Sequence, residues 1–75
     1  MTITERLKEI LRIKQCNVST LARQVNLYQS TVQNYFDGRT PSVPFLEALL
    51  RAFPDISAEW LLMGEGEPLK EQKDA

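Results

Sequence analysis

Residues 17–40, NVSTLARQVNLYQSTVQNYFDGRT, decide the fold of this chain. Their first part carries apolar residues at the i, i+3, i+4 and i+7 spacing of one helix face, namely Val18, Leu21, Ala22 and Val25. The second part, about residues 29–36, gathers its apolar side chains on one side of a further short helix. Asn26 between them suits a left-handed turn, and Gly38 is a typical C-terminal stop. The stretch therefore predicts two short helices joined by a tight turn.

The other side of the second short helix is polar and carries no charge. Its members are Gln29, Ser30, Gln33 and Asn34. Amide side chains both donate and accept hydrogen bonds, and glutamine can pair with N6 and N7 of adenine in the major groove of DNA. We therefore expect these four residues to read base edges, with Gln29 as the best reader. The alternative is an ordinary solvated helix face.

Three segments of the chain carry a resemblance to a known family. They are LARQVN (residues 21–26), QSTVQNYFDGRTPS (29–42) and ISAEWLLMGEGEP (56–68). Together they resemble the helix-turn-helix domain of the lambda Cro and phage-repressor (XRE-type) family, over about residues 3–68. The resemblance implies an all-α, compact five-helix bundle of the lambda-repressor type. It also implies a sequence-specific transcriptional regulator, acting as a repressor, with the helix at 29–36 in the major groove of double-stranded DNA.

Contacts to the DNA backbone and between two copies of the chain follow from the same resemblance. The expected backbone contacts are Asn17, Arg23, Tyr28 and Arg39. A homodimer on a two-fold operator is expected to use Pro54, Ile56, Leu62 and Met63. Plainer alternatives are a helix cap for Asn17, a solvated charge for Arg39, an aromatic packed on the turn for Tyr28, and completion of the core for Leu62 and Met63.

Two departures from the family pattern are visible. Tyr28 stands where the family has a Ser or Thr cap, and an aromatic ring cannot accept the free N–H groups of the first turn. The start of that helix is therefore expected to be shifted or frayed. Leu11 and Phe36 stand where the family often pairs Arg with Glu. Because both partners are apolar here, no charge is left buried alone, and the paired change agrees with the fold.

Further helices are expected at residues 3–14, at about 44–53, and from the Ser57 cap to about Met63, around the two short ones. Thr2 and Glu5 form a capping box for the first, with charged residues on its solvated face, namely Glu5, Arg6, Lys8, Glu9 and Arg12. Pro54 ends the fourth helix, and Ser57 caps the fifth. We expect Trp60 and Cys16 to be buried, a domain over residues 1–66, and a flexible acidic tail over 67–75.

The length, pI and charge distribution of the chain limit the functions it can have. Seventy-five residues allow one domain, and the pI near 5.3 is low for a DNA-binding protein. The charge is unevenly spread, because residues 1–46 hold six basic and three acidic side chains, whereas residues 47–75 hold three basic and seven acidic ones. The positive half contains the expected reading helix. The acidic balance leaves one alternative function, a protein-interaction module such as an antitoxin or adaptor.

Other classes of function find little support in the sequence. There is no histidine, no nucleophile with a base and no phosphate-binding glycine loop, so we expect no enzyme. One cysteine supplies neither a metal cluster nor an internal disulfide, and no cofactor or small-molecule ligand is expected. No long apolar run or signal region predicts a membrane or secreted location. The expected compartment is the cytoplasm, with the resemblance implying a bacterial or phage-encoded protein at the nucleoid.

Overall fold

The computed structural model describes residues 1–70, and their backbone forms five helices. These are α1 (Ile3–Lys14), α2 (Val18–Val25), α3 (Gln29–Phe36), α4 (Val43–Ala52) and α5 (Ala58–Met63). Apart from an isolated bridge between Ile56 and Leu69, no β-structure occurs in the described part of the chain. The predicted all-α five-helix fold is confirmed, and the bounds of α1, α3 and α4 lie within one residue of those expected.

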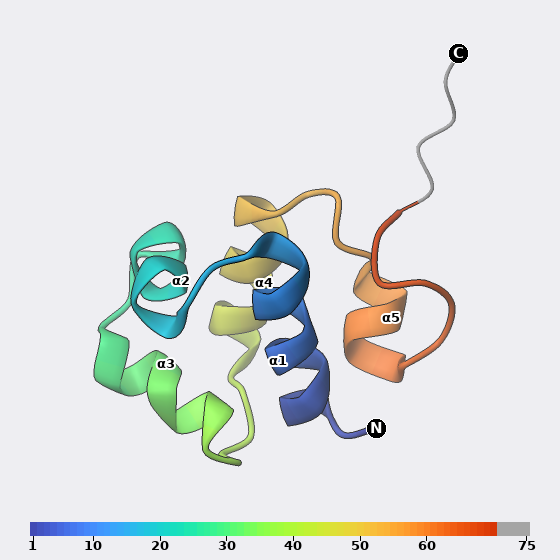
Figure 1. Cartoon of the computed structure of the whole chain (residues 1–75). Helices are drawn as coiled ribbons and strands as arrows, with labels where there is room; N and C mark the ends of the chain where they lie inside the picture. The colour runs from blue at the N-terminus through green and yellow to red at the C-terminus, as the bar shows by residue number, and fades with distance from the viewer. Residues whose placement is uncertain (71–75) are drawn as a thin grey trace.

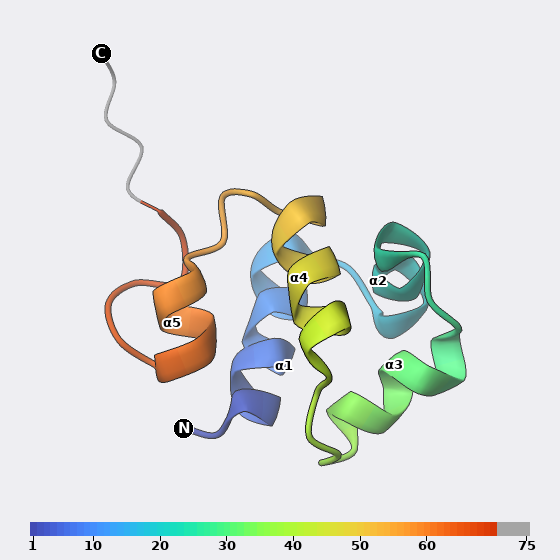
Figure 2. The ribbon, with the colours of Figure 1, turned by 180° about the vertical axis from the view of Figure 1, so that it is seen from behind.

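Helix α1 lies in the middle of the bundle. It contacts α3 on one side and α5 on the other, while α2 contacts α3 and α4. Figure 1 and the reverse view in Figure 2 both place the α2–α3 pair at one side of the molecule and α5 at the opposite side. Surfaces on α3 and on α5 therefore lie at opposite ends of the bundle.

The core is built from one apolar face of each helix and from Ile56 in the connection between α4 and α5. Its buried side chains are Leu7, Ile10, Leu21, Ala22, Val25, Val32, Tyr35, Phe36, Phe45, Leu49, Ile56, Trp60 and Leu61. Leu11 is partly buried and packs against this cluster, so Leu11 and Phe36 both serve the apolar core. Trp60 is buried as predicted, whereas Cys16 is only partly buried. Burial raises the pKa of the Cys16 thiol, which lowers its reactivity.

Local signals define the helix ends. Thr2 and Glu5 form the predicted capping box, and Asn26 takes the left-handed conformation with φ of 60°. Ser57 accepts a hydrogen bond from the first turn of α5, as expected. Ser42 does the same for α4, which begins at Val43, so Pro44 falls in its first turn. The cap formed by Ser42 was not anticipated from the sequence.

The prediction that Arg6 lies on the solvated face of α1 is wrong. Only 8% of the residue is exposed, and its guanidinium donates hydrogen bonds to backbone carbonyls. The helical period explains the burial, because Arg6 follows Ile3 by three residues and precedes Ile10 by four, which places it on the apolar side.

The chain turns back onto the domain after α5. The Ser57 N–H donates to the Pro68 carbonyl at 2.8 Å, and the Lys70 N–H donates to the Asp55 carbonyl at 2.8 Å. Between them, Leu69 forms the isolated bridge with Ile56. Residues 68–70 are thus held against the fold instead of belonging to a flexible tail. Glu67, the first residue of the predicted tail, is exposed, and the last part of that tail, residues 71–75, lies outside the described residues.

Candidate nucleic-acid interface

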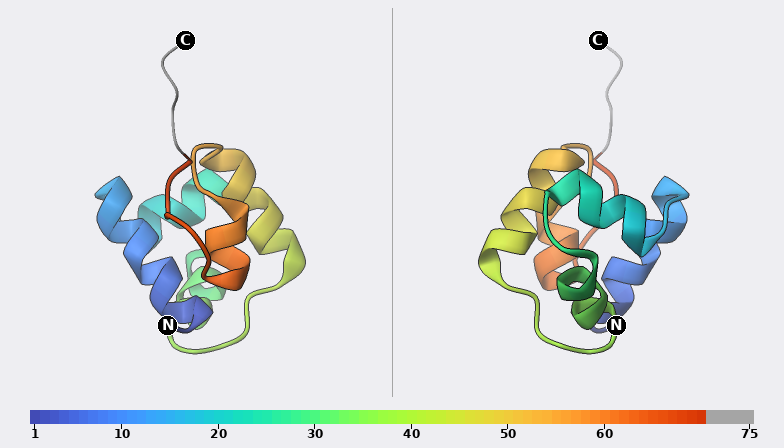
Figure 3. Two further views of the ribbon diagram at one scale, coloured as in Figure 1. Left: turned by 90° about the vertical axis from the view of Figure 1, so that its right-hand side faces the viewer. Right: turned by 90° about the vertical axis from the view of Figure 1, so that its left-hand side faces the viewer.

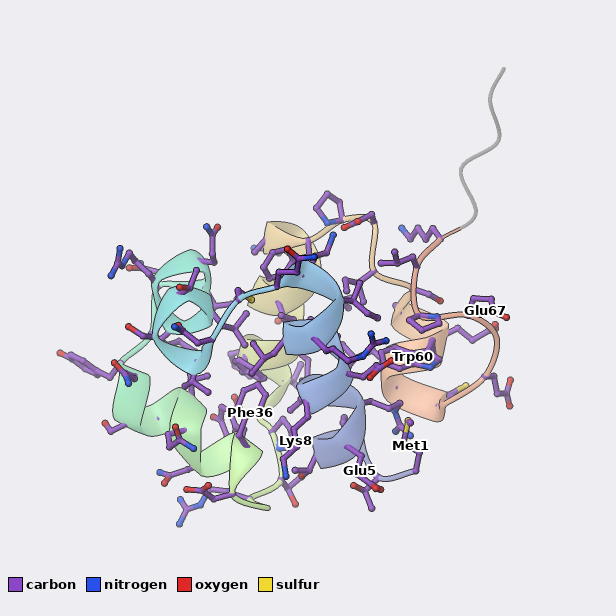
Figure 4. The ribbon with its side chains drawn as sticks, viewed as in Figure 1. Met1, Glu5, Lys8, Phe36, Trp60 and Glu67 are labelled. Carbon is purple, nitrogen blue, oxygen red and sulfur yellow. The ribbon has the colours of Figure 1, made fainter. Side chains whose placement is uncertain are left out.

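Helix α3 is fixed to the bundle by its apolar side. The Tyr35 ring lies 4.6 Å from the Phe45 ring, measured between centroids, and its hydroxyl is 3.2 Å from the Ser42 hydroxyl. Val32 is fully buried beside them. Figure 4 shows Phe36 pointing from the end of α3 toward α1. These contacts from α1 and α4 leave the helix one orientation, with its polar side turned to solvent.

The polar strip of α3 is exposed along its whole length, as predicted. All four of its residues, Gln29, Ser30, Gln33 and Asn34, are exposed. The Gln33 amide donates to the Asp37 carboxylate at 3.2 Å, which fixes that side chain against the end of the helix. The side chains of the other three form no hydrogen bond within residues 1–70, so their donors and acceptors face solvent. A role for the strip in reading bases stays a prediction.

The start of α3 differs from the other helix starts. The helix begins at Gln29, so the expected shift is not observed, and no side chain accepts its first-turn N–H groups. Tyr28, at the N-cap, is 82% exposed and does not pack on the turn. An open depression of about 370 Å³ is lined by Asn26, Leu27, Tyr28 and Thr31. Leu27 and Thr31 were not singled out in the sequence, although both neighbour the turn.

Three expected backbone-contact residues belong to α2 or to the loop that follows α3. The Asn17 carbonyl oxygen Oδ1 accepts the Thr20 N–H at 2.8 Å, so Asn17 caps α2 while its amide nitrogen remains a donor. Arg23, in the last turn of α2, and Arg39, after Gly38, are exposed. Neither arginine forms an ion pair in the described part of the chain. The right-hand view in Figure 3 shows α2 and α3 on one side of the molecule, with the loop that follows α3 below them.

The residues expected at a dimer contact do not form one patch. Ile56 is 1% exposed and belongs to the core, so its assignment to a surface is wrong. Its backbone forms the isolated bridge with Leu69 of the returning segment. Pro54 is exposed but lies in the connection before α5. Leu62 and Met63, in the last turn of α5, are 49% and 70% exposed. The alternative in which these two complete the core is therefore also wrong.

Other kinds of site find no support in the structure of residues 1–70. No helix there combines the length and apolar character needed to cross a bilayer. That part of the chain also brings together no group of three or more side chains able to hold a metal ion. Comparison with protein-family models, with curated proteins and with solved structures gave no match to this chain.

Proposed function

We propose that this chain is a sequence-specific DNA-binding protein that regulates transcription as a repressor, with α3 reading the major groove. The observation that carries the proposal is the uncharged polar strip on a helix that is anchored by three buried side chains. Charged residues would solvate such a face more effectively, whereas amides and a hydroxyl offer directed hydrogen bonds to base edges. The resemblance of residues 21–42 to phage-repressor helix-turn-helix segments supports the same function.

The surroundings of α3 suit a DNA backbone. Arg23 and Arg39 are unpaired within residues 1–70, so each can approach a phosphate without breaking an ion pair. The free amide nitrogen of Asn17 offers a third, uncharged contact. The carboxylates of Glu59, Glu65 and Glu67 belong to α5 and the segment after it, at the opposite end of the bundle. These carboxylates therefore weaken attraction at α3 only slightly, and Asp37, which accepts the Gln33 amide, is the carboxylate that lies against the strip.

Tyr28 and the depression beside it suit an apolar contact at the edge of the same interface. The exposed ring stands next to Gln29, and Leu27 contributes a further apolar side chain to the lining. The C5-methyl of thymine is the apolar group that the major groove presents. We place this methyl against Tyr28, while the hydroxyl of the ring can reach a phosphate.

Two copies are expected to share a two-fold operator. One recognition helix covers too few base pairs to select a site among those of a genome. Because α3 and α5 lie at opposite ends, two copies that meet through α5 would carry their reading helices at the far ends of the pair. That arrangement suits half-sites about 34–36 Å apart, one turn of DNA.

Selection of bound sequences from random duplex DNA, followed by gel shifts at two salt concentrations, tests the function. A selected consensus and a steep fall in affinity with salt are expected. Arg23→Ala and Arg39→Ala should each weaken all sequences alike and lower the salt slope by about one unit. Arg51→Ala, an exposed arginine of α4, is the matched control and should leave the slope unchanged.

A second candidate function, a protein-interaction module, would be favoured if the chain selected no DNA consensus. Exposed Leu62 and Met63, near the carboxylates of Glu59 and Glu65, would also suit a protein partner. A protein-interaction module would select no consensus and would show no salt-dependent binding to bulk DNA. Such a result would reject the DNA-binding function in favour of an antitoxin or adaptor role.

A further inference from the structure

Arg6 is a buried cation whose partners are backbone carbonyls. Its Nε donates to the Leu61 carbonyl at 2.8 Å, its Nη1 to the Met1 carbonyl at 2.8 Å, and its Nη2 to the Leu62 carbonyl at 3.5 Å. A charge removed from water is costly unless it is well hydrogen-bonded, and these carbonyls supply that compensation. The guanidinium thus joins the start of the chain to the end of α5.

The end of α5 depends on these hydrogen bonds. A helix leaves its last four carbonyls without partners inside the helix, and α5 has only six residues. The Gly64 N–H satisfies the Trp60 carbonyl at 2.8 Å, while Arg6 donates to the next two carbonyls. The positive charge of Arg6 also interacts favourably with the negative C-terminal end of the helix dipole. Arg6 therefore closes the turn that carries Leu62 and Met63.

Three exposed apolar side chains are brought together by this arrangement. Met1 is 76% exposed, and its carbonyl accepts a hydrogen bond from the same guanidinium as the Leu62 carbonyl does. Met63 follows Leu62 directly in the chain. Figure 4 shows Met1 beside the end of α5, and the left-hand view in Figure 3 shows the N-terminus and α5 on one face. An apolar surface made from two distant parts of the sequence thus depends on one buried side chain.

We infer that Arg6 is a positioning residue for the contact between two DNA-bound copies, because it holds Leu62 and Met63 in the orientation in which a second copy meets them. The inference rests on the proposed function. A second copy is the occupant, because α5 lies at the end of the bundle opposite α3, where a neighbour bound to the other half of a two-fold operator would meet it. Three side chains are far fewer than the 20–30 residues per partner of a stable interface, so free copies associate only weakly, at high concentration, and DNA strengthens the contact by holding the copies close together.

The shape of the guanidinium explains why arginine is needed at this position. Its N–H groups form a planar fork that reaches three carbonyls at once, whereas a lysine ammonium is a compact charge on a flexible stem. Arg6→Lys keeps the charge and removes the fork. Gly64 adds a steric limit, because a Cβ at that position would lie 3.0 Å from Nη1 of Arg6. The fork is therefore fitted closely against the turn that follows α5.

The test compares binding to a single half-site with binding to the complete two-fold operator. In the wild-type chain the second half-site is expected to raise affinity by about 100-fold. Arg6→Lys should lower this gain about tenfold and leave half-site affinity within about twofold, because α3 lies at the other end of the bundle. Leu46→Ala, which removes a partly buried side chain of α4, is the control for lost stability. Urea unfolding of both variants shows whether their stabilities match.

A second measurement does not depend on DNA. NMR chemical shifts of the wild-type chain at rising concentration should move at residues 58–63, and those of Arg6→Lys should not. The inference is overturned if Arg6→Lys keeps the full gain, if Leu46→Ala loses as much at equal stability, or if shifts at 58–63 do not depend on concentration. A chain that associates through α5 in an Arg6-dependent manner but binds no DNA would support the role of Arg6 and reject the proposed function.

Discussion

Gln29 offers the sharpest test at the scale of a single residue. Its side chain is exposed at the first position of α3 and forms no hydrogen bond within residues 1–70, so both of its amide atoms are free. Gln29→Ala should weaken binding to the selected operator by about 1–3 kcal/mol, because a bidentate base contact is lost. Affinity for random DNA should barely change.

Competitive gel shifts with the selected site and a scrambled site measure the difference. Gln24→Ala removes the same side-chain type from an exposed position of α2, outside the strip, and should not alter the preference for the selected site. Equal losses on both DNAs for Gln29→Ala would show that Gln29 does not read bases.

Arg6 shows that residue type alone does not predict burial. The charge suggested a solvated side chain, yet its position between Ile3 and Ile10 on the helical period already indicated the buried side. What the sequence could not supply was the partner, because carbonyls 55 and 56 residues further along the chain accept its hydrogen bonds. Periodicity predicts which side of a helix a residue takes, whereas a long-range partner depends on how the helices assemble.

At the scale of elements, local signals predicted helices better than connections. The α2–turn–α3 unit followed from its apolar spacing, the Asn17 cap and the left-handed Asn26, all of which act within a few residues. The return of residues 68–70 onto the domain could not be predicted from local signals, because its hydrogen bonds to Asp55 and Ser57 join segments more than ten residues apart. Burial of Ile56, whose backbone forms a bridge with Leu69 of that segment, was missed as well.

Helix α5 is too short to be stable without tertiary packing. Trp60 and Leu61 supply that packing, since both are buried against the core. Trp60→Ala should lower the free energy of unfolding by about 3–5 kcal/mol, which a domain of this size can barely tolerate. Thermal unfolding followed by circular dichroism measures the loss. Near-native stability of the variant would contradict the anchoring role of the ring.

A charged contact ties α1 to the connection before α5. The Lys14 ammonium pairs with the Asp55 carboxylate and lies 5.5 Å from the centroid of the Phe53 ring. The hydrogen bond from Lys14 holds the pKa of Asp55 below its ordinary value of 3.8. This contribution to stability is therefore present above the unfolded pKa and is lost as the pH falls through the folded one.

Asp55→Asn should remove that part of the pH dependence. At pH 7 the variant should lose about 0.2–1 kcal/mol, since the pair is partly solvated. As the pH falls through the lowered pKa of Asp55, the difference between the two chains should shrink toward zero, because the wild-type carboxyl becomes protonated as well. Urea unfolding between pH 2 and pH 7 checks this convergence. A constant difference across the range would show that the side chain acts through packing and not through its charge.

For the whole molecule, the spatial order of charge and polarity matters more than the net charge of −1. The uncharged strip and two free arginines lie at the α3 end, and an apolar surface near the carboxylates of Glu59 and Glu65 lies at the α5 end. The sequence indicated this division through its two halves. It could not show that α1 separates the two ends, because that follows from the assembled bundle.

The separation of the two ends leads to a prediction about operator spacing. If two copies touch through α5 while each α3 reads a half-site, the contact requires both half-sites on one face of the duplex. Five inserted base pairs rotate one half-site by about half a turn and move it about 17 Å along the axis. A contact of a few side chains cannot bridge that change, so the gain in affinity from the second half-site should disappear.

Single half-site affinity provides the internal control, since the insertion leaves each half-site intact. Footprinting should then show each half-site filling independently at a higher protein concentration. Ten inserted base pairs restore the face of the duplex but move the half-sites about 34 Å further apart, so the gain should not return through a direct contact. Unchanged tight binding to the five-base-pair insertion would show that each copy acts alone, and it would reject both the two-fold arrangement and a contact through Leu62 and Met63.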